Sequence, residues 1–88
     1  DVNGIEAQEL FTDVEIYPNP ASNYLTIDLG QHLDIESITV MDVTGKVVIQ
    51  QMVNSNKQTI NINELSNGVY HVKVTGAAKH CFYKFVKL

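Results

Sequence analysis

The 88-residue chain has no tryptophan, two prolines and one cysteine. A single cysteine excludes an intramolecular disulfide, and because Cys81 lies in an apolar run we expect a packed thiol. The unbroken apolar runs are at most three residues long, as in residues 47–49, whereas a helix that spans a membrane needs about 20 such residues. We therefore expect no direct membrane insertion.

Charged side chains are also scarce, at 18% of the chain with a net charge of −4. This balance argues against nucleic acid as a partner, because phosphate binding needs a basic surface. The hydrophobic share of 44% is that of one folded domain with a modest core. The chain opens on Asp1 rather than methionine, and we expect it to be a fragment of a longer protein.

No group of residues has the spacing of a catalytic or metal centre. His80 and Cys81 are adjacent in a strand pattern, so their side chains point to opposite faces and cannot form a dyad. Asp28, His32 and Asp34 share one segment, which we interpret as a polar loop rather than a metal site. We therefore expect no enzyme activity, no metal and no cofactor.

Alternating apolar and polar residues predict an all-β fold. Leu25, Ile27 and Leu29 alternate with polar residues, which is the period of a strand with one buried face. Turn signals separate about seven such segments. The predicted strands are residues 14–17, 24–29, 37–43, 46–53, 60–62, 69–75 and 80–88. This spacing favours an antiparallel β-sandwich over a closed barrel.

The aromatic residues supply volume in a sandwich that lacks tryptophan. We expect most of them at core or rim positions, with a carbohydrate-binding face as the alternative. They are Phe11, Tyr17, Tyr24, Tyr70, Phe82, Tyr83 and Phe85.

The two prolines, Pro18 and Pro20, stand one residue apart. Proline cannot donate to a strand ladder, so we expect an edge strand that stops at Tyr17. The next residues predict either a turn over residues 19–22 or one turn of 3₁₀ helix that begins at Pro20.

Two other turns are predicted from glycine. Thr44-Gly45 separates two strand patterns and indicates a hairpin. The Gly45-Lys46 pair does not fit a phosphate-binding loop, because valine occupies positions 40 and 47. Asn67-Gly68 indicates a turn that tolerates positive φ.

The final strand is the basic end of an acidic chain, since four of the six lysines follow residue 72. One interpretation is edge protection, because lysines discourage pairing between sheets. The other is a strand that a partner recognises. Apolar residues occupy both of its faces, so burial of Phe82, Val86 and Leu88 competes with burial of Tyr83 and Phe85.

Four segments in order resemble one known family. They are YPNPASNYLTI (17–27), ITVMDVTGKVV (38–48), INELSNGVYHVKV (62–74) and YKFVKL (83–88). Their order and spacing are similar to the C-terminal sorting domain of the type IX secretion system, the Por secretion tail of Bacteroidota. The resemblance covers residues 13–88 and implies an immunoglobulin-like sandwich of seven strands. Residues 1–12 resemble a flexible linker remnant.

The resemblance also implies a function. Members direct a folded passenger from the periplasm through the outer-membrane translocon to the surface or exterior of Gram-negative Bacteroidota. A surface sortase then removes the domain and can transfer the passenger to lipopolysaccharide. The implied partners are the translocon, the sortase and a covalently attached N-terminal passenger. An Ig-like carbohydrate-binding or adhesion module on a secreted enzyme is the alternative, and an exposed edge is compatible with a homodimer.

The resemblance assigns roles to two sets of residues. The structural set is Pro18, Asn19 and Pro20 of the proline motif, Gly45 and Lys46 of the central turn, and Asn67, Gly68 and Tyr70 of the glycine–tyrosine turn. The set expected to be read by the translocon is Lys84, Phe85, Val86, Lys87 and Leu88. Within it, we expect Lys84 and Lys87 to supply specificity.

Overall fold

The computed structural model describes residues 14–30, 35–77 and 80–88, which contain seven strands and no helix. The strands are β1 Glu15–Tyr17, β2 Tyr24–Asp28, β3 Ile35–Met41, β4 Val47–Met52, β5 Lys57–Asn61, β6 Gly68–Gly76 and β7 His80–Lys87. Each predicted strand is present with bounds shifted by a few residues. No helix in these segments is long and apolar enough to cross a membrane. The linker expected over residues 1–12 lies outside the described residues.

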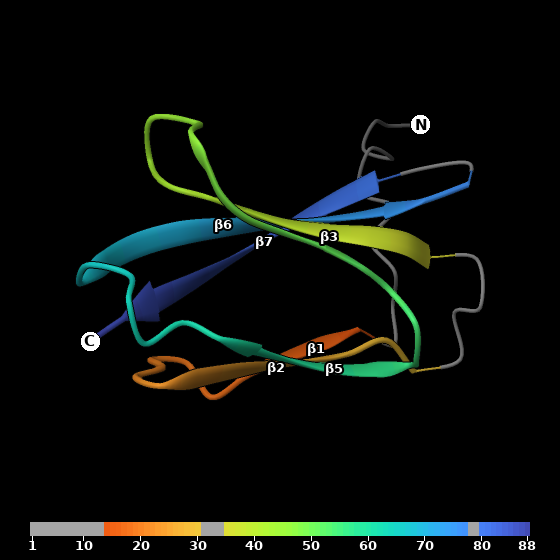
Figure 1. Ribbon diagram of the computed structural model, residues 1–88, viewed down its shortest axis with the longest axis horizontal. Coiled ribbons are helices and arrows are strands. Elements are labelled where there is room, and N and C mark those ends of the chain that lie inside the picture. Colours follow the sequence, from red (N-terminus) through yellow and green to blue (C-terminus); the bar gives the residue numbers. More distant parts are fainter. Residues whose placement is uncertain (1–13, 31–34, 78–79) are drawn as a thin grey trace, which may run out of the picture.

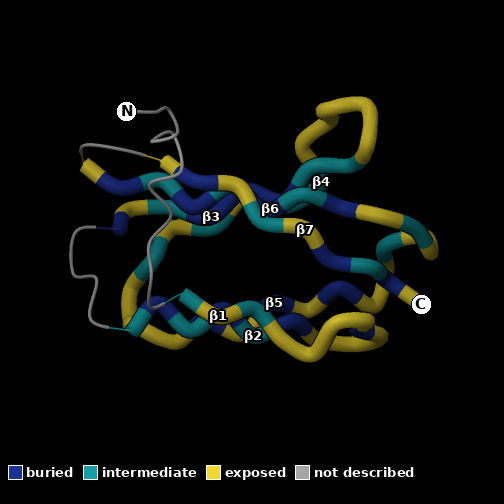
Figure 2. Tube along the Cα trace, turned by 180° about the vertical axis from the view of Figure 1, so that it is seen from behind, coloured by how far each residue is buried: buried dark blue, intermediate teal, exposed yellow. Residues whose placement is uncertain are grey.

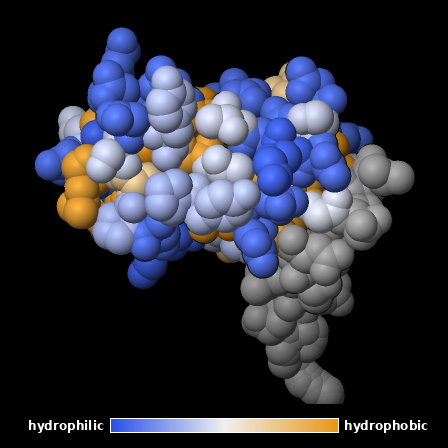
Figure 3. Space-filling view, turned by 90° about the horizontal axis from the view of Figure 1, so that it is seen from below, coloured by the Kyte–Doolittle hydropathy of each residue, from blue (hydrophilic) through white to orange (hydrophobic). Residues whose placement is uncertain are grey.

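The strands form two packed antiparallel sheets, which confirms the predicted sandwich (Figure 1). One sheet has the order β1-β2-β5 and the other the order β4-β3-β6-β7. As predicted from the two prolines, β1 is an edge strand that ends at Tyr17. The face of the three-stranded sheet seen from below is mainly hydrophilic (Figure 3).

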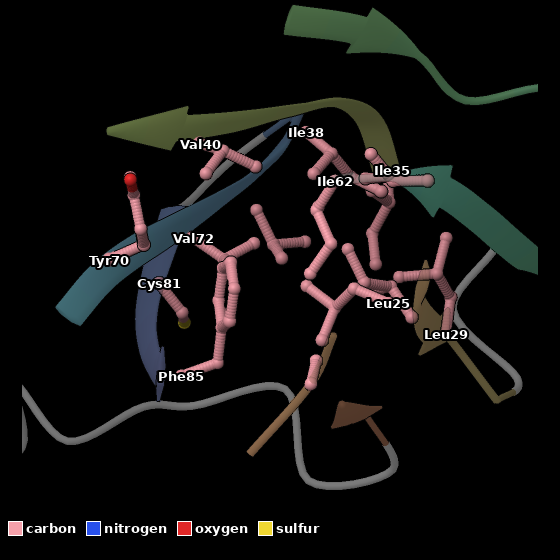
Figure 4. Packing of buried hydrophobic residues seen from close by; sticks show 14 residues of the cluster. Leu25, Leu29, Ile35, Ile38, Val40, Ile62, Tyr70, Val72, Cys81 and Phe85 are labelled. Carbon is pink, nitrogen blue, oxygen red and sulfur yellow. The ribbon is translucent and has the colours of Figure 1, made fainter. Parts of the chain in front are cut away.

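The core lies between the two sheets, where the buried segments face each other (Figure 2). Alternation turns Leu25 and Ile27 of β2 and Val72 and Val74 of β6 into the space between the sheets, and all four side chains have no exposed surface. Phe85 of β7 belongs to the same buried cluster (Figure 4). Burial of each such side chain is worth about 1.5–3 kcal/mol, so the strand period accounts for the packing of the sandwich.

The aromatic residues divide between the core and the surface. The expectation of core or rim positions holds for Tyr70 and Phe85, which are 6% and 0% exposed. In contrast, Tyr24 is 55% exposed and Phe82 is 51% exposed. The aliphatic side chains of β2, β3 and β6 supply most of the core volume instead.

Candidate functional site: the C-terminal strand

The strand expected to be recognised, β7, lies at the edge of the four-stranded sheet. It pairs with β6 over its whole length, from Gly68 opposite Lys87 to Thr75 opposite His80. An edge strand presents the N–H and C=O groups of every second residue on its unpaired side. The environment of that side therefore decides what a partner can reach.

The two faces of β7 differ in burial. Cys81, Phe85 and Lys87 point inward and are 6% exposed or less. Phe82 and Lys84 point to the outward face and are exposed. Of the two alternatives for the last strand, the fold therefore adopts the one that buries Phe85. In this arrangement Phe85 packs on the buried ring of Tyr70.

The glycine–tyrosine turn supports β7 from the β6 side. Tyr70 lies opposite Phe85, and their rings stack with centroids 5.5 Å apart and an interplanar angle of 20°. The Tyr70 hydroxyl donates to the carbonyl of Ser66 at 2.7 Å. Gly68 lies opposite Lys87 and has a φ of 151°, a backbone conformation that residues other than glycine rarely adopt. This turn thus positions the ring on which Phe85 packs.

The proline turn supports β7 from its other edge. The Tyr17–Pro18 and Asn19–Pro20 bonds are both cis. The Asn19 side chain accepts a hydrogen bond from the N–H of Val86 at 3.0 Å and donates one to the carbonyl of Lys84 at 3.4 Å. A carboxamide has one acceptor and one donor side, so Asn19 matches the two backbone groups that a neighbouring strand would pair with.

Ala21 continues this pairing with its own backbone. Its N–H donates to the carbonyl of Val86 at 2.8 Å, and its carbonyl accepts from the N–H of Leu88 at 2.9 Å. The contact forms a parallel bridge to Lys87, and Ala21 is 1% exposed. The edge of β7 is therefore closed from the Lys84 carbonyl to the Leu88 N–H.

The proline turn differs from both predicted forms. The described residues contain no 3₁₀ helix, and no hydrogen bond from the Ser22 N–H to the Asn19 carbonyl closes a turn over residues 19–22. The local arguments considered only neighbours in the chain. The backbone around Asn19 is instead shaped by its contacts with β7.

The two lysines expected to supply specificity lie in different environments. Lys84 is exposed on the outward face. Lys87 is 6% exposed, and its ammonium donates to the carbonyl oxygen of Leu88 at 3.3 Å. Strand alternation places Lys87 on the inward face, where its aliphatic stem packs while the charged end reaches the rim. Lys84 is therefore the cation of this pair that faces solvent.

The Gly45-Lys46 turn is separate from this site and closes on itself. The Asp42 carboxylate accepts hydrogen bonds from the N–H groups of Thr44 and Lys46 and from the Thr44 hydroxyl. The hydroxyl bond is the main cause that lowers the pKa of Asp42 below its ordinary value of 3.8. Gly45 has a φ of +89°. No hydrogen bond of the described residues joins this turn to β7.

Among the described residues, no metal site competes with β7 as the functional feature. Asp28 lies 4.0 Å from the ammonium of Lys57 and also caps the N–H of Gly30. The other two residues of the polar loop, His32 and Asp34, lie outside the described residues. Within residues 14–30, 35–77 and 80–88, no three His, Cys, Asp or Glu side chains are placed to hold a metal ion.

A family model described as the secretion system C-terminal sorting domain, Por_Secre_tail, matches residues 15–88. The chain belongs to this family. The match confirms the type IX resemblance that the four segments indicated. Three of the motifs that carried the resemblance lie together in the sorting domain. The proline motif and the glycine–tyrosine turn both contact the end of the terminal strand.

The sorting domain is similar to part of a much longer enzyme. It is 29% identical over 76 residues to an endo-acting ulvan lyase of Formosa agariphila, which corresponds to 85% of this chain and 14% of the lyase. The chain therefore spans only a small part of the curated relative it matches.

Two solved structures share the fold. One comes from a study of PorZ, a surface component of the type-IX secretion system of Porphyromonas gingivalis, with a TM-score of 0.76 and 24% identity over 97% of this chain and 13% of that chain. The other is CopC from Methylosinus trichosporium OB3b, with a TM-score of 0.56 and 20% identity over 84% of this chain and 92% of that chain. At these identities the likeness establishes the fold alone.

Sequence reasoning missed two features of the site. It did not identify Ala21 as a pairing residue, nor the Asn19 side chain as a substitute for a strand. The only signal was composition: an Asn between two prolines cannot enter a regular ladder, so its side chain is free to bond elsewhere.

Proposed function

We propose that this sorting domain is the export signal of a larger secreted protein and acts by binding rather than by catalysis. Its family membership and its similarity to a small part of a long lyase support an enzyme passenger. The type IX machinery carries the passenger through the periplasm and across the outer membrane to the surface or the medium. A sortase then removes the domain and can attach the passenger to lipopolysaccharide.

One observation carries this proposal: three family motifs that are far apart in the sequence converge on the last five residues. Asn19 and Ala21 hold one edge of the strand, and Tyr70 holds its inward face. A strand held on two sides is presented in one geometry, so a partner loses little entropy in ordering it.

The convergence divides the terminal residues into two roles. Phe85 and Lys87 are buried, and we assign them the role of holding the strand in place. Lys84 and Leu88 are exposed, and Leu88 retains 60% of its surface. We propose that these two side chains contact the translocon directly.

Export of a reporter tests the proposal. Residues 1–88 are fused to a fluorescent protein that is delivered to the periplasm of a type IX-competent bacterium. We expect Lys84→Glu to reduce the exported fraction roughly tenfold, as charge reversal at a contact does. Lys46→Glu, which reverses an exposed lysine in the separate turn, serves as the matched control and should be exported normally.

Two outcomes contradict the proposal in different ways. Normal export of the Lys84→Glu fusion, with folding verified by circular dichroism, removes the terminal strand as the recognised element. Equal export of a reporter without residues 1–88 removes the sorting function itself. The intact mass of the exported reporter also separates the alternatives, because a binding or adhesion module remains attached whereas a processed signal does not.

A further inference from the structure

The outward face formed by β6 and β7 is rich in cations and lacks acids. Neither strand contains an aspartate or a glutamate. Lys73 lies opposite Phe82 and His71 lies opposite Lys84, all on this face. The Lys73 ammonium is 6.0 Å from the centroid of the Phe82 ring, and the His80 ring meets the same ring edge-on at 5.7 Å. The result is an exposed aromatic ring surrounded by basic groups.

This face adjoins a short length of open strand edge. The backbone groups of Val86 and Leu88 point away from β6, because they bond to Asn19 and Ala21. The β6–β7 register has no irregularity, so the N–H and C=O of Phe82 and the N–H of Lys84 also point away from β6. None of the hydrogen bonds between described residues involves these three groups. We call these three backbone groups, together with the side chains of Phe82, Lys84 and the neighbouring Lys73, the open window.

The charge of the open window contrasts with that of the chain. The net charge is −4, yet the window carries only basic and apolar side chains. The acids of the strands lie elsewhere, with Glu15 and Asp28 on the three-stranded sheet and Glu36 on β3. Pairing of two copies at this edge would place like charges opposite each other, which is unfavourable. The window is therefore complementary to an acidic partner rather than to a second copy.

We propose that the open window binds an acidic, extended segment of a partner protein by strand addition. Main-chain bonds to Phe82 and Lys84 supply the pairing, and alternate side chains of the added strand point to the outward face. Carboxylates on that side reach Lys84 and, across the edge of the Phe82 ring, Lys73. The inference deepens the proposed function, since it gives the chemistry of the export partner.

The proline turn limits the length of the added strand. It occupies the edge of β7 from the carbonyl of Lys84 onward. An added strand that continued past Lys84 would collide with Asn19. The partner segment therefore pairs with two or three residues only, and the turn sets its register.

A peptide titration tests this proposal with the full chain of residues 1–88 labelled with ¹⁵N. The probe is a synthetic seven-residue peptide that alternates glutamate and valine, with blocked ends. We expect saturable shifts of the amide signals of Phe82 and Lys84. Lys73→Glu should raise the Kd about tenfold, whereas Lys46→Glu should leave it unchanged. High salt should weaken binding, because the charge contacts lie at the surface.

Matched probes separate strand addition from other modes. A lysine–valine peptide and an acidic peptide with N-methylated amides should both fail to bind. Equal binding of the N-methylated peptide overturns main-chain pairing, and shifts confined to other strands overturn the site. Binding of phosphatidylglycerol vesicles without binding of the acidic peptide assigns the face to a membrane surface. Dimerisation through β7 without peptide assigns it to a second copy, and no binding at all overturns the proposal.

Export of the Lys73→Glu reporter fusion keeps the two proposals distinguishable. Reduced export together with weakened peptide binding supports the open window as the surface read during sorting. Loss of peptide binding with normal export shows that the open window is not read during sorting. The proposed export function is then judged separately, by the Lys84→Glu fusion.

Discussion

The proline turn and the β3–β4 turn both stand out in the sequence, yet they are stabilised by different partners. Asn19 bonds to Val86, 67 residues further along the chain. Asp42 bonds to Thr44 and Lys46, within four residues. The first turn needs the assembled sandwich, whereas the second carries its own hydrogen-bond acceptor. The comparison teaches that a turn motif can belong either to local structure or to a distant strand.

Asn19→Ala is expected to have the largest effect on this comparison. It removes the partner of the Val86 N–H and of the Lys84 carbonyl, so we expect the free energy of unfolding to fall by about 2 kcal/mol. Urea denaturation measures it. Asn23→Ala, at an exposed asparagine that directly precedes β2, should change stability by less than about 0.5 kcal/mol.

The same position separates the two hydrogen bonds of Asn19. Asn19→Asp keeps an acceptor for the Val86 N–H but cannot donate to Lys84, so its loss should be smaller than that of Asn19→Ala. Equal stability of the parent and Asn19→Ala would show that the proline turn does not depend on β7.

Gly45→Ala tests the self-contained turn and should have an intermediate effect. The φ of Gly45 is +89°, and no atom lies within 4 Å of an added Cβ. The cost is therefore backbone strain alone, about 1 kcal/mol by urea denaturation. Val43→Ala, at a side chain that is 69% exposed, is the matched control. In both variants the amide signals of β7 should stay unchanged; movement of those signals would couple the two turns.

The smallest effect concerns the pH dependence of the self-contained turn. The pKa of Asp42 is lowered on folding, chiefly by the Thr44 hydroxyl. A lowered pKa contributes stability above the unfolded value, and that contribution is lost as pH falls through the folded value. The stability difference between the parent and Asp42→Asn should therefore shrink below pH 3.8.

Unfolding at pH 6 and at about pH 2 checks this prediction, with an NMR titration of the Asp42 carboxylate to locate its pKa. Thr44→Val should move that pKa back toward its ordinary value. A pKa of Asp42 at or above 3.8 in the parent would contradict the hydrogen-bond account.

Strand alternation predicted most of the fold. The period of Leu25, Ile27 and Leu29 identified their buried face correctly. The proline spacing predicted that β1 is an edge strand. These features depend on one residue and its near neighbours, so a local pattern contains enough information to predict them.

The arrangement of the candidate site was not predictable in the same way. On β7, apolar residues occupy both faces, and only the position of Tyr70 shows why Phe85 is buried. The burial of Lys87 follows from that choice, because alternate residues share a face. The role of Asn19 depends on where Val86 lies, and neither residue carries a local signal of the other.

The sequence by itself determined the strands, their buried faces in the clearly alternating segments, and the family. Only the tertiary structure decided that the proline turn closes one half of the β7 edge, while the backbone of Phe82 and the N–H of Lys84 bond to no other described residue. The physical reason is the range of the interactions. Backbone period and turn chemistry act over a few residues, whereas edge pairing joins segments more than 60 residues apart.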